Sequence, residues 1–140
     1  MSASEPFDAD KIVSLWSELL TLQIALGYYP DSSSISFPPP EGRAIDEAIC
    51  QEYRLSSEVV TLMKRLPCPS SFDDAWDTTI FNESVAVPFA ENKYIRNSRD
   101  PDNSWSGPFR PDYMYPSDLA LVLEKDESGY HLILDTKASR

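Results

Sequence analysis

The stretch LALVLEKDESGYHLILD, residues 119–135, holds the clearest structural signal in the sequence. Two apolar runs, Leu119–Leu123 and Tyr130–Leu134, enclose the polar segment Lys125–Gly129. A glycine at the end of a short polar segment can adopt a positive φ, which is typical of the turn between two antiparallel strands. The stretch therefore predicts a C-terminal β-hairpin, and it contains His131, the only histidine of the chain.

Helical periodicity dominates the chain before residue 67. Residues 8–26 are expected to form a helix that Asp8 caps and Gly27 ends. Additional apolar residues widen its hydrophobic face, which indicates a helix covered on more than one side or docked across a sheet. The main apolar stripe, with the spacing of one helix face, comprises Ile12, Leu15, Trp16, Leu19, Leu22 and Leu26.

Two shorter helices are expected over residues 44–53 and 57–66. Ser56 is the expected N-cap of the later helix, and Leu55 can pack on Val60 as a hydrophobic staple. Four apolar residues with helical spacing would form its core stripe: Val59, Leu62, Met63 and Leu66.

Residues 67–118 are rich in Pro, Asp, Asn, Ser and aromatic residues, without a helical period longer than two turns. Helices that precede strands in this way are typical of an α+β fold. A chain of 140 residues is expected to form one domain. We therefore expect a single domain, 1–140, in which helices within 8–66 pack on a small, mostly antiparallel sheet formed within 67–135 that ends in the C-terminal hairpin.

The formal net charge is −11, from 23 acidic and 12 basic residues. Such a charge disfavours binding to nucleic acids and to anionic membrane surfaces, and favours a basic protein as partner. The polar N-terminus does not resemble a signal peptide, and no apolar run is long enough to span a bilayer, so a cytoplasmic or nuclear location is expected. Cys50 and Cys68 lack the spacing of a metal site or a disulfide framework. We expect reduced thiols and no cofactor.

Asp73, Asp74 and Asp77 form a DDxxD pattern. On one face of a helix, such carboxylates can hold Mg²⁺ ions on a diphosphate. The chain is too short for the all-helical enzymes that use this motif, and it has no second metal motif or basic diphosphate clamp nearby. A solvated turn or helix start is the favoured interpretation, and no metal site is predicted.

His131 and Asp135 fall on the same face if residues 131–135 form a regular strand. A histidine and a carboxylate on one face are suited to acid–base chemistry, with the carboxylate orienting the imidazole. Tyr130, Leu132 and Leu134 would then form the core face. The alternative is that His131 is simply a polar surface residue.

Residues 94–115 have the most unusual composition, because arginines and aromatic residues are concentrated there. These residue types dominate recognition surfaces. Either they bind a partner, or the aromatic side chains pack on the sheet while the arginines pair with acidic residues. The candidate binding residues are Arg96, Arg99, Trp105, Arg110, Tyr113 and Tyr115.

Short motifs in the second and third expected helices and in the hairpin are formed by Ile49, Glu52, Leu55-Ser56, Gly129, Leu134 and Asp135. In these motifs the chain resembles the SUKH superfamily of Smi1/Knr4-like proteins. The segments Arg65–Pro67 and HLILDT, residues 131–136, are also similar to a group of uncharacterised filamentous-fungal proteins. The resemblance implies an α+β domain that binds other proteins, as bacterial toxin-immunity and fungal cell-wall-signalling members do.

Two functions are therefore expected as alternatives. The first is a non-catalytic, intracellular protein-interaction module that uses the arginine and aromatic segment. The second is a small cofactor-independent enzyme, an isomerase, cyclase or hydrolase, that acts on a small organic molecule with His131 and Asp135 as acid–base groups. A deep apolar pocket around these two residues would favour the enzyme, and a flat sheet face would favour the interaction module.

Overall fold

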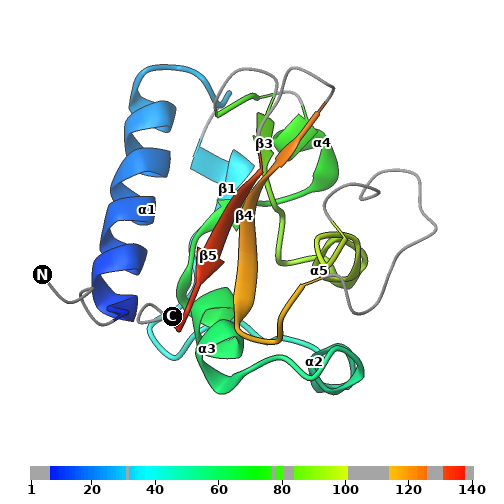
Figure 1. The fold of residues 1–140 in the computed structure, drawn as a ribbon. Helices are drawn as coiled ribbons and strands as arrows, with labels where there is room; N and C mark the ends of the chain where they lie inside the picture. The colour runs from blue at the N-terminus through cyan, green and yellow to red at the C-terminus, as the bar shows by residue number, and fades with distance from the viewer. Residues whose placement is uncertain are drawn as a thin grey trace, which may run out of the picture.

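The fold is known from a computed structural model that describes residues 7–30, 32–76, 78–80, 84–100, 114–125 and 131–137 (Figure 1). Gly129, Tyr130, Trp105, Arg110, Tyr113 and Asp77 lie outside these ranges. The described elements, in chain order, are α1 (Ala9–Ala25), a 3₁₀ turn (Ser32–Ser34), β1 (Ile35–Ser36), α2 (Glu47–Glu52), α3 (Ser57–Arg65), β2 (Cys68–Pro69), α4 (Phe72–Trp76), β3 (Ser84–Ala86), α5 (Asn92–Asn97), β4 (Asp118–Glu124) and β5 (Leu132–Asp135).

The main sheet is antiparallel and has the strand order β3-β4-β5. Its last two strands form the predicted C-terminal hairpin, so the α+β fold with a small antiparallel sheet is confirmed. A second, two-stranded antiparallel pair joins β1 to β2.

The central strand β4 is buried over five consecutive residues, 119–123. Successive side chains of a strand point to opposite faces, so an unbroken buried run means that both faces of β4 are covered. Figure 1 shows α1 on one side of the sheet and α5 on the other. The sheet is therefore the middle layer of the fold, which explains why Leu119–Leu123 is continuously apolar.

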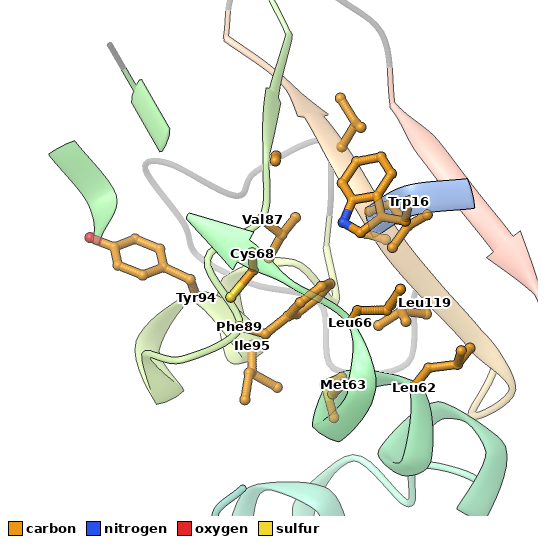
Figure 2. Packing of buried hydrophobic residues seen from close by; sticks show 14 of the residues in the cluster. Trp16, Leu62, Met63, Leu66, Cys68, Val87, Phe89, Tyr94, Ile95 and Leu119 are labelled. Atoms are coloured by element: carbon orange, nitrogen blue, oxygen red, sulfur yellow. The ribbon is translucent and has the colours of Figure 1, made fainter. Parts of the chain in front are cut away.

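One hydrophobic core joins the helices to the sheet, and Figure 2 shows side chains from α1, α3 and β4 that belong to it. Trp16 of α1 reaches this core, and its Nε1 donates to the carbonyl oxygen of Pro67 at 2.9 Å. This hydrogen bond satisfies the polar atom of a buried indole and ties α1 to the segment that follows α3.

The third helix follows its prediction closely. The Ser56 hydroxyl accepts from the backbone N–H of Val59 at 3.3 Å, as an N-cap should. Leu66 leaves the helix with ψ 135, in keeping with the restriction that Pro67 places on the residue before it. All four residues of the predicted stripe are buried.

The second helix is shorter than predicted, because Asp46 caps it. The Asp46 carboxylate accepts from the N–H of Ala48 at 2.8 Å, which starts the helix at Glu47 rather than at Ala44.

The stripe predicted for the first helix is only partly right: Trp16 is buried, and Ile12 and Leu19 pack against the core. Asp8 caps α1 and Gly27 follows it with φ 81, as expected. However, Leu15, Leu22 and Leu26 are 53%, 53% and 62% exposed. Besides Trp16, the helix buries Leu20 and Gln23.

The face predicted for β5 is also only partly right. Leu134 packs on the core, but Leu132 is 38% exposed. The register between β4 and β5 shifts between Ala120 and Val122. A bulge of this kind places two residues of one strand opposite one of its partner, and so interrupts the alternation assumed for a regular pair.

Candidate functional site

Arg99, a predicted binding residue, is buried inside the protein. Its guanidinium donates from Nη1 to the carbonyl oxygen of Asp118 at 2.5 Å and from Nη2 to that of Tyr115 at 2.7 Å. Burial lowers the pKa of Arg99 to about 10, while the nearby Asp118 opposes this shift. The side chain thus holds the start of β4 against the end of α5.

Arg96 and Tyr115 lie at the surface. Arg96 pairs with Glu52 of α2 at 3.2 Å, and this hydrogen bond and charge raise its pKa. Tyr115 is 67% exposed, just before β4. Within the described residues, Arg96 thus pairs with an acidic residue, as one of the two interpretations expected, whereas Arg99 donates to backbone carbonyls.

His131 lies beside Glu124 at the end of β4. The backbone N–H of Glu124 donates to His131 Nδ1 at 3.2 Å, and His131 Nε2 lies 3.6 Å from Glu124 Oε1. To accept this hydrogen bond, Nδ1 must carry no proton. The imidazole thus supplies an acceptor to the sheet at the point where the regular β4–β5 pairing ends.

Asp135 is at the other end of the hairpin. It pairs in register with Asp118, and its Oδ1 accepts from the N–H of Lys137 at 2.8 Å. The four residue steps from His131 to Asp135 span about 13 Å along an extended strand. The structure therefore does not bring these two side chains into contact with each other.

The two described members of the DDxxD pattern lie in α4. Ser71 Oγ accepts from the N–H of Asp74 and donates to Asp74 Oδ2, at 3.2 and 3.0 Å, while Asp73 is exposed. The Ser71 hydroxyl thus caps the start of α4, and Asp74 accepts a hydrogen bond from that same hydroxyl. In the part of the chain that the structure describes, no group of three or more His, Cys, Asp or Glu residues could hold a metal ion.

The same described residues contain no helix long and apolar enough to cross a membrane. Cys50 and Cys68 are buried free thiols. Burial raises the pKa of both thiols, so neither has the lowered pKa of a reactive cysteine.

Arg43 is a buried residue that sequence reasoning missed. Its Nη1 donates to the carbonyl oxygens of Met63 and Leu66, at 2.8 and 2.5 Å, and its Nη2 donates to that of Ser36 at 2.9 Å. A cation at the C-terminal end of a helix satisfies carbonyls that have no partner within the helix. Arg43 therefore anchors the end of α3 to β1, and its position in a proline-rich connector carried no signal of this role.

The outward face of α1 is the most apolar exposed surface among the described helices. At about 100° per residue, Leu15, Leu22 and Leu26 fall within about 40° of one another around the helix axis. The buried side chains of Trp16, Leu20 and Gln23 are centred about 100° away from them. We call Leu15, Leu22 and Leu26 the leucine seam; each is more than half exposed.

Two charged residues, Glu18 and Lys11, lie close to the seam. Glu18 lies one turn from Leu15 and from Leu22 and is exposed. Asp10 lies about 140° from Leu15 around the helix axis and pairs with Arg65 of α3 at 2.6 Å. Lys11 is exposed one turn before Leu15.

No protein-family model matches the chain, and no similar curated protein or solved structure was found.

Proposed function

We propose that this protein is a non-catalytic protein-interaction domain and that the leucine seam of α1 contacts its partner. The observation that carries the proposal is the exposure of Leu15, Leu22 and Leu26 on one face of a helix whose other face is already packed on the core. Clustered exposed apolar residues on a helix are characteristic of binding surfaces, because leaving them in water is unfavourable.

The spacing of the seam indicates the shape of the partner. Leu15, half-buried Leu19, Leu22 and Leu26 follow one another at intervals of four, three and four residues. This is the spacing with which one helix packs lengthwise along another. An amphipathic helix that lays its own apolar stripe along α1 would cover all three exposed leucines.

The charge of the protein indicates the chemistry of the partner. With a net charge of −11, the domain attracts a cationic partner and repels an anionic one. We therefore propose a partner helix with lysine or arginine residues beside its apolar stripe, which would meet Glu18.

The proposed role also agrees with the resemblance of the sequence to the SUKH proteins, which implies an α+β domain that binds other proteins. In the 94–115 segment, Arg99 is buried and bonds to the backbone, so it supports the fold. Of the two aromatic residues described there, Tyr94 is buried and Tyr115 is exposed. The enzymatic alternative has less support, because His131 and Asp135 lie at opposite ends of β5.

Photo-crosslinking tests the proposal directly. A photoreactive amino acid at position 22 should capture one protein in an extract of the native cells, and the same group at position 37 should not. Phe37 is a suitable control because it is 48% exposed, close to the 53% of Leu22, but lies outside α1.

The captured protein is then purified and titrated with variants of the domain. A Leu15→Glu, Leu22→Glu double variant should weaken binding at least about tenfold, because it introduces two charges into an apolar contact. Phe37→Ser should bind normally. Equal capture from positions 22 and 37, or unchanged affinity of a folded double variant, would contradict the proposal.

A further inference from the structure

A groove of about 430 Å³ lies between α2 and α3, away from the leucine seam. It is lined by Glu47, Cys50, Gln51, Arg54, Leu55 and Val60. Cys50 is buried and Leu55 and Val60 are half-buried, whereas Glu47, Gln51 and Arg54 are exposed. The groove thus combines an apolar interior with a polar rim, an arrangement common in ligand sites.

Arg54 adopts an unusual backbone conformation at this rim. Its φ of 53 is the only positive value of a non-glycine residue in the described ranges. Arg54 directly follows the C-cap of α2, and two hydrogen bonds fix the turn: Arg54 N–H to the carbonyl of Gln51 at 3.1 Å, and Leu55 N–H to that of Cys50 at 2.9 Å. This is the Schellman motif, in which glycine is the usual residue at the position of Arg54.

The chain contains a direct comparison at the end of α1. There the N–H of Gly27 donates to Ile24 at 3.0 Å and that of Tyr28 donates to Gln23 at 2.9 Å, with the glycine at φ 81. The two helices end with the same pair of hydrogen bonds, but only α1 has the residue that adopts positive φ without steric cost. Arginine at position 54 therefore makes the protein less stable than glycine would. A residue kept in an unfavourable backbone conformation in this way is a sign of a functional role.

The guanidinium of Arg54 also differs from those of the other described arginines. Arg65 and Arg96 pair with carboxylates, and Arg43 and Arg99 donate to backbone carbonyls. Among the described residues, no carboxylate lies within ion-pair distance of Arg54. In a chain with 23 acidic residues, an arginine without such a partner beside an apolar groove is a suitable receptor for an external anion.

We infer that this groove binds the C-terminal end of a peptide whose last residue is aliphatic. The aliphatic side chain would lie against Cys50, Leu55 and Val60, and the terminal carboxylate would meet the Arg54 guanidinium, whose planar fork matches a carboxylate. Glu47 at the same rim repels further negative charge, so the groove favours a single carboxylate over a phosphate or another polyanion. This inference does not depend on the leucine seam, since none of the lining residues belongs to α1.

The test uses N-acetyl-leucine as the probe and N-acetyl-leucinamide as its uncharged counterpart. Each is titrated into the ¹⁵N-labelled full chain while the amide resonances are followed. The acid should shift the resonances of residues 47–60 with a Kd on the order of millimolar, as befits a ligand of this size. The amide should bind about tenfold more weakly, because it lacks the charge that Arg54 recognises.

The decisive variant is Arg54→Gly, which separates binding from stability. It should remove the preference for the acid over the amide, and it should also raise the Tm by about 2–6 °C because glycine adopts this conformation without strain. Arg54→Lys should retain part of the preference, and Arg65→Gln, a control outside the groove, should retain all of it. Equal binding of acid and amide, shifts centred outside residues 47–60, binding of neither probe, or a preference that persists in Arg54→Gly would overturn the inference.

Discussion

The guanidinium of Arg99 donates a hydrogen bond of 2.5 Å to the backbone carbonyl of Asp118, across 19 residues of sequence. A second bond of 2.7 Å reaches the carbonyl of Tyr115. A buried cation is costly unless its donors are satisfied, and two carbonyl acceptors partly offset this cost. Burial still lowers the pKa of Arg99 to about 10. The two hydrogen bonds therefore hold the segment that follows α5 against the start of β4.

Arg99→Met should consequently destabilise the protein by about 2–4 kcal/mol, because it leaves two carbonyl groups without their charged donor. Urea denaturation of the purified domain measures this loss. Arg96→Met is the matched control, since its ion pair with Glu52 is half-exposed and should contribute less than about 1 kcal/mol. Similar losses in the two variants would contradict the structural role of Arg99.

The orientation of α1 can be tested with two leucines that are close together in the sequence but differ in burial. Leu20 is fully buried and Leu22 is 53% exposed. Leu20→Ala should lower the free energy of unfolding by about 2–5 kcal/mol, whereas Leu22→Ala should change it by less than about 0.5 kcal/mol. Urea denaturation of the two variants measures both changes. The reverse order would mean that the helix packs on the stripe predicted from the sequence.

Tyr29 should make the stability of the protein sensitive to alkaline pH. Its ring is buried, and within the described residues its hydroxyl has no hydrogen-bond partner. Burial, followed by the charges of Asp74 and Cys68, raises its pKa from 10.0 to about 12. The unfolded chain therefore releases this proton at lower pH than the folded protein. As pH rises from 10 to 12, the contribution of Tyr29 to stability should be lost, by about 2–3 kcal/mol.

Tyr29→Phe should remove this pH dependence while leaving stability at pH 7 unchanged or slightly higher, because it deletes an unsatisfied hydroxyl and no hydrogen bond. Urea denaturation at pH 7 and pH 11 provides the comparison. Arg99, with its lowered pKa, increases stability as pH rises in this range. This contribution is the same in the wild type and in Tyr29→Phe, so it cancels when their free energies of unfolding are subtracted. Tyr28→Phe is the control, because Tyr28 is exposed, and an equal slope in both variants would refute the prediction.

The contact between His131 and Glu124 should protect one specific amide. Because His131 Nδ1 accepts from the Glu124 N–H at 3.2 Å, His131→Phe should accelerate hydrogen exchange of the Glu124 amide by about five- to tenfold, corresponding to the loss of one hydrogen bond of about 1 kcal/mol. His131→Asn is the conservative control. Its side-chain oxygen is the same number of bonds from Cα as Nδ1 of histidine, so it can accept the hydrogen bond from the Glu124 N–H. Unchanged exchange in His131→Phe would show that the contact does not stabilise the sheet.

Local features of the sequence were predictable because each depends on residues close to one another in the chain. The caps supplied by Asp8 and Ser56 accept the hydrogen bonds expected of them. The hairpin also forms as predicted, with β4 and β5 paired antiparallel. The hydrophobic stripe of α3 is narrow, so only one orientation of this helix could bury it.

Long-range contacts of polar residues were not predictable. Arg43 and Arg99 look like surface arginines in the sequence, and only the carbonyl groups of distant segments make them buried structural residues. The bulge between Ala120 and Val122 likewise left no sequence signal. Leu132, which pairs with Val122 beside this shift, is 38% exposed, although it was predicted to lie on the core face.

The sequence by itself determined the caps of the first and third helices, the strand pair within residues 119–135, and that apolar residues surround more than half of the first helix. The tertiary structure decided which of those apolar residues would be buried. A helix with so broad an apolar surface can pack in several orientations of similar hydrophobic gain, and the shape of the sheet with the hydrogen bond from Trp16 to Pro67 selects one of them. That selection leaves Leu15, Leu22 and Leu26 in water, and so creates the surface on which the proposed function rests.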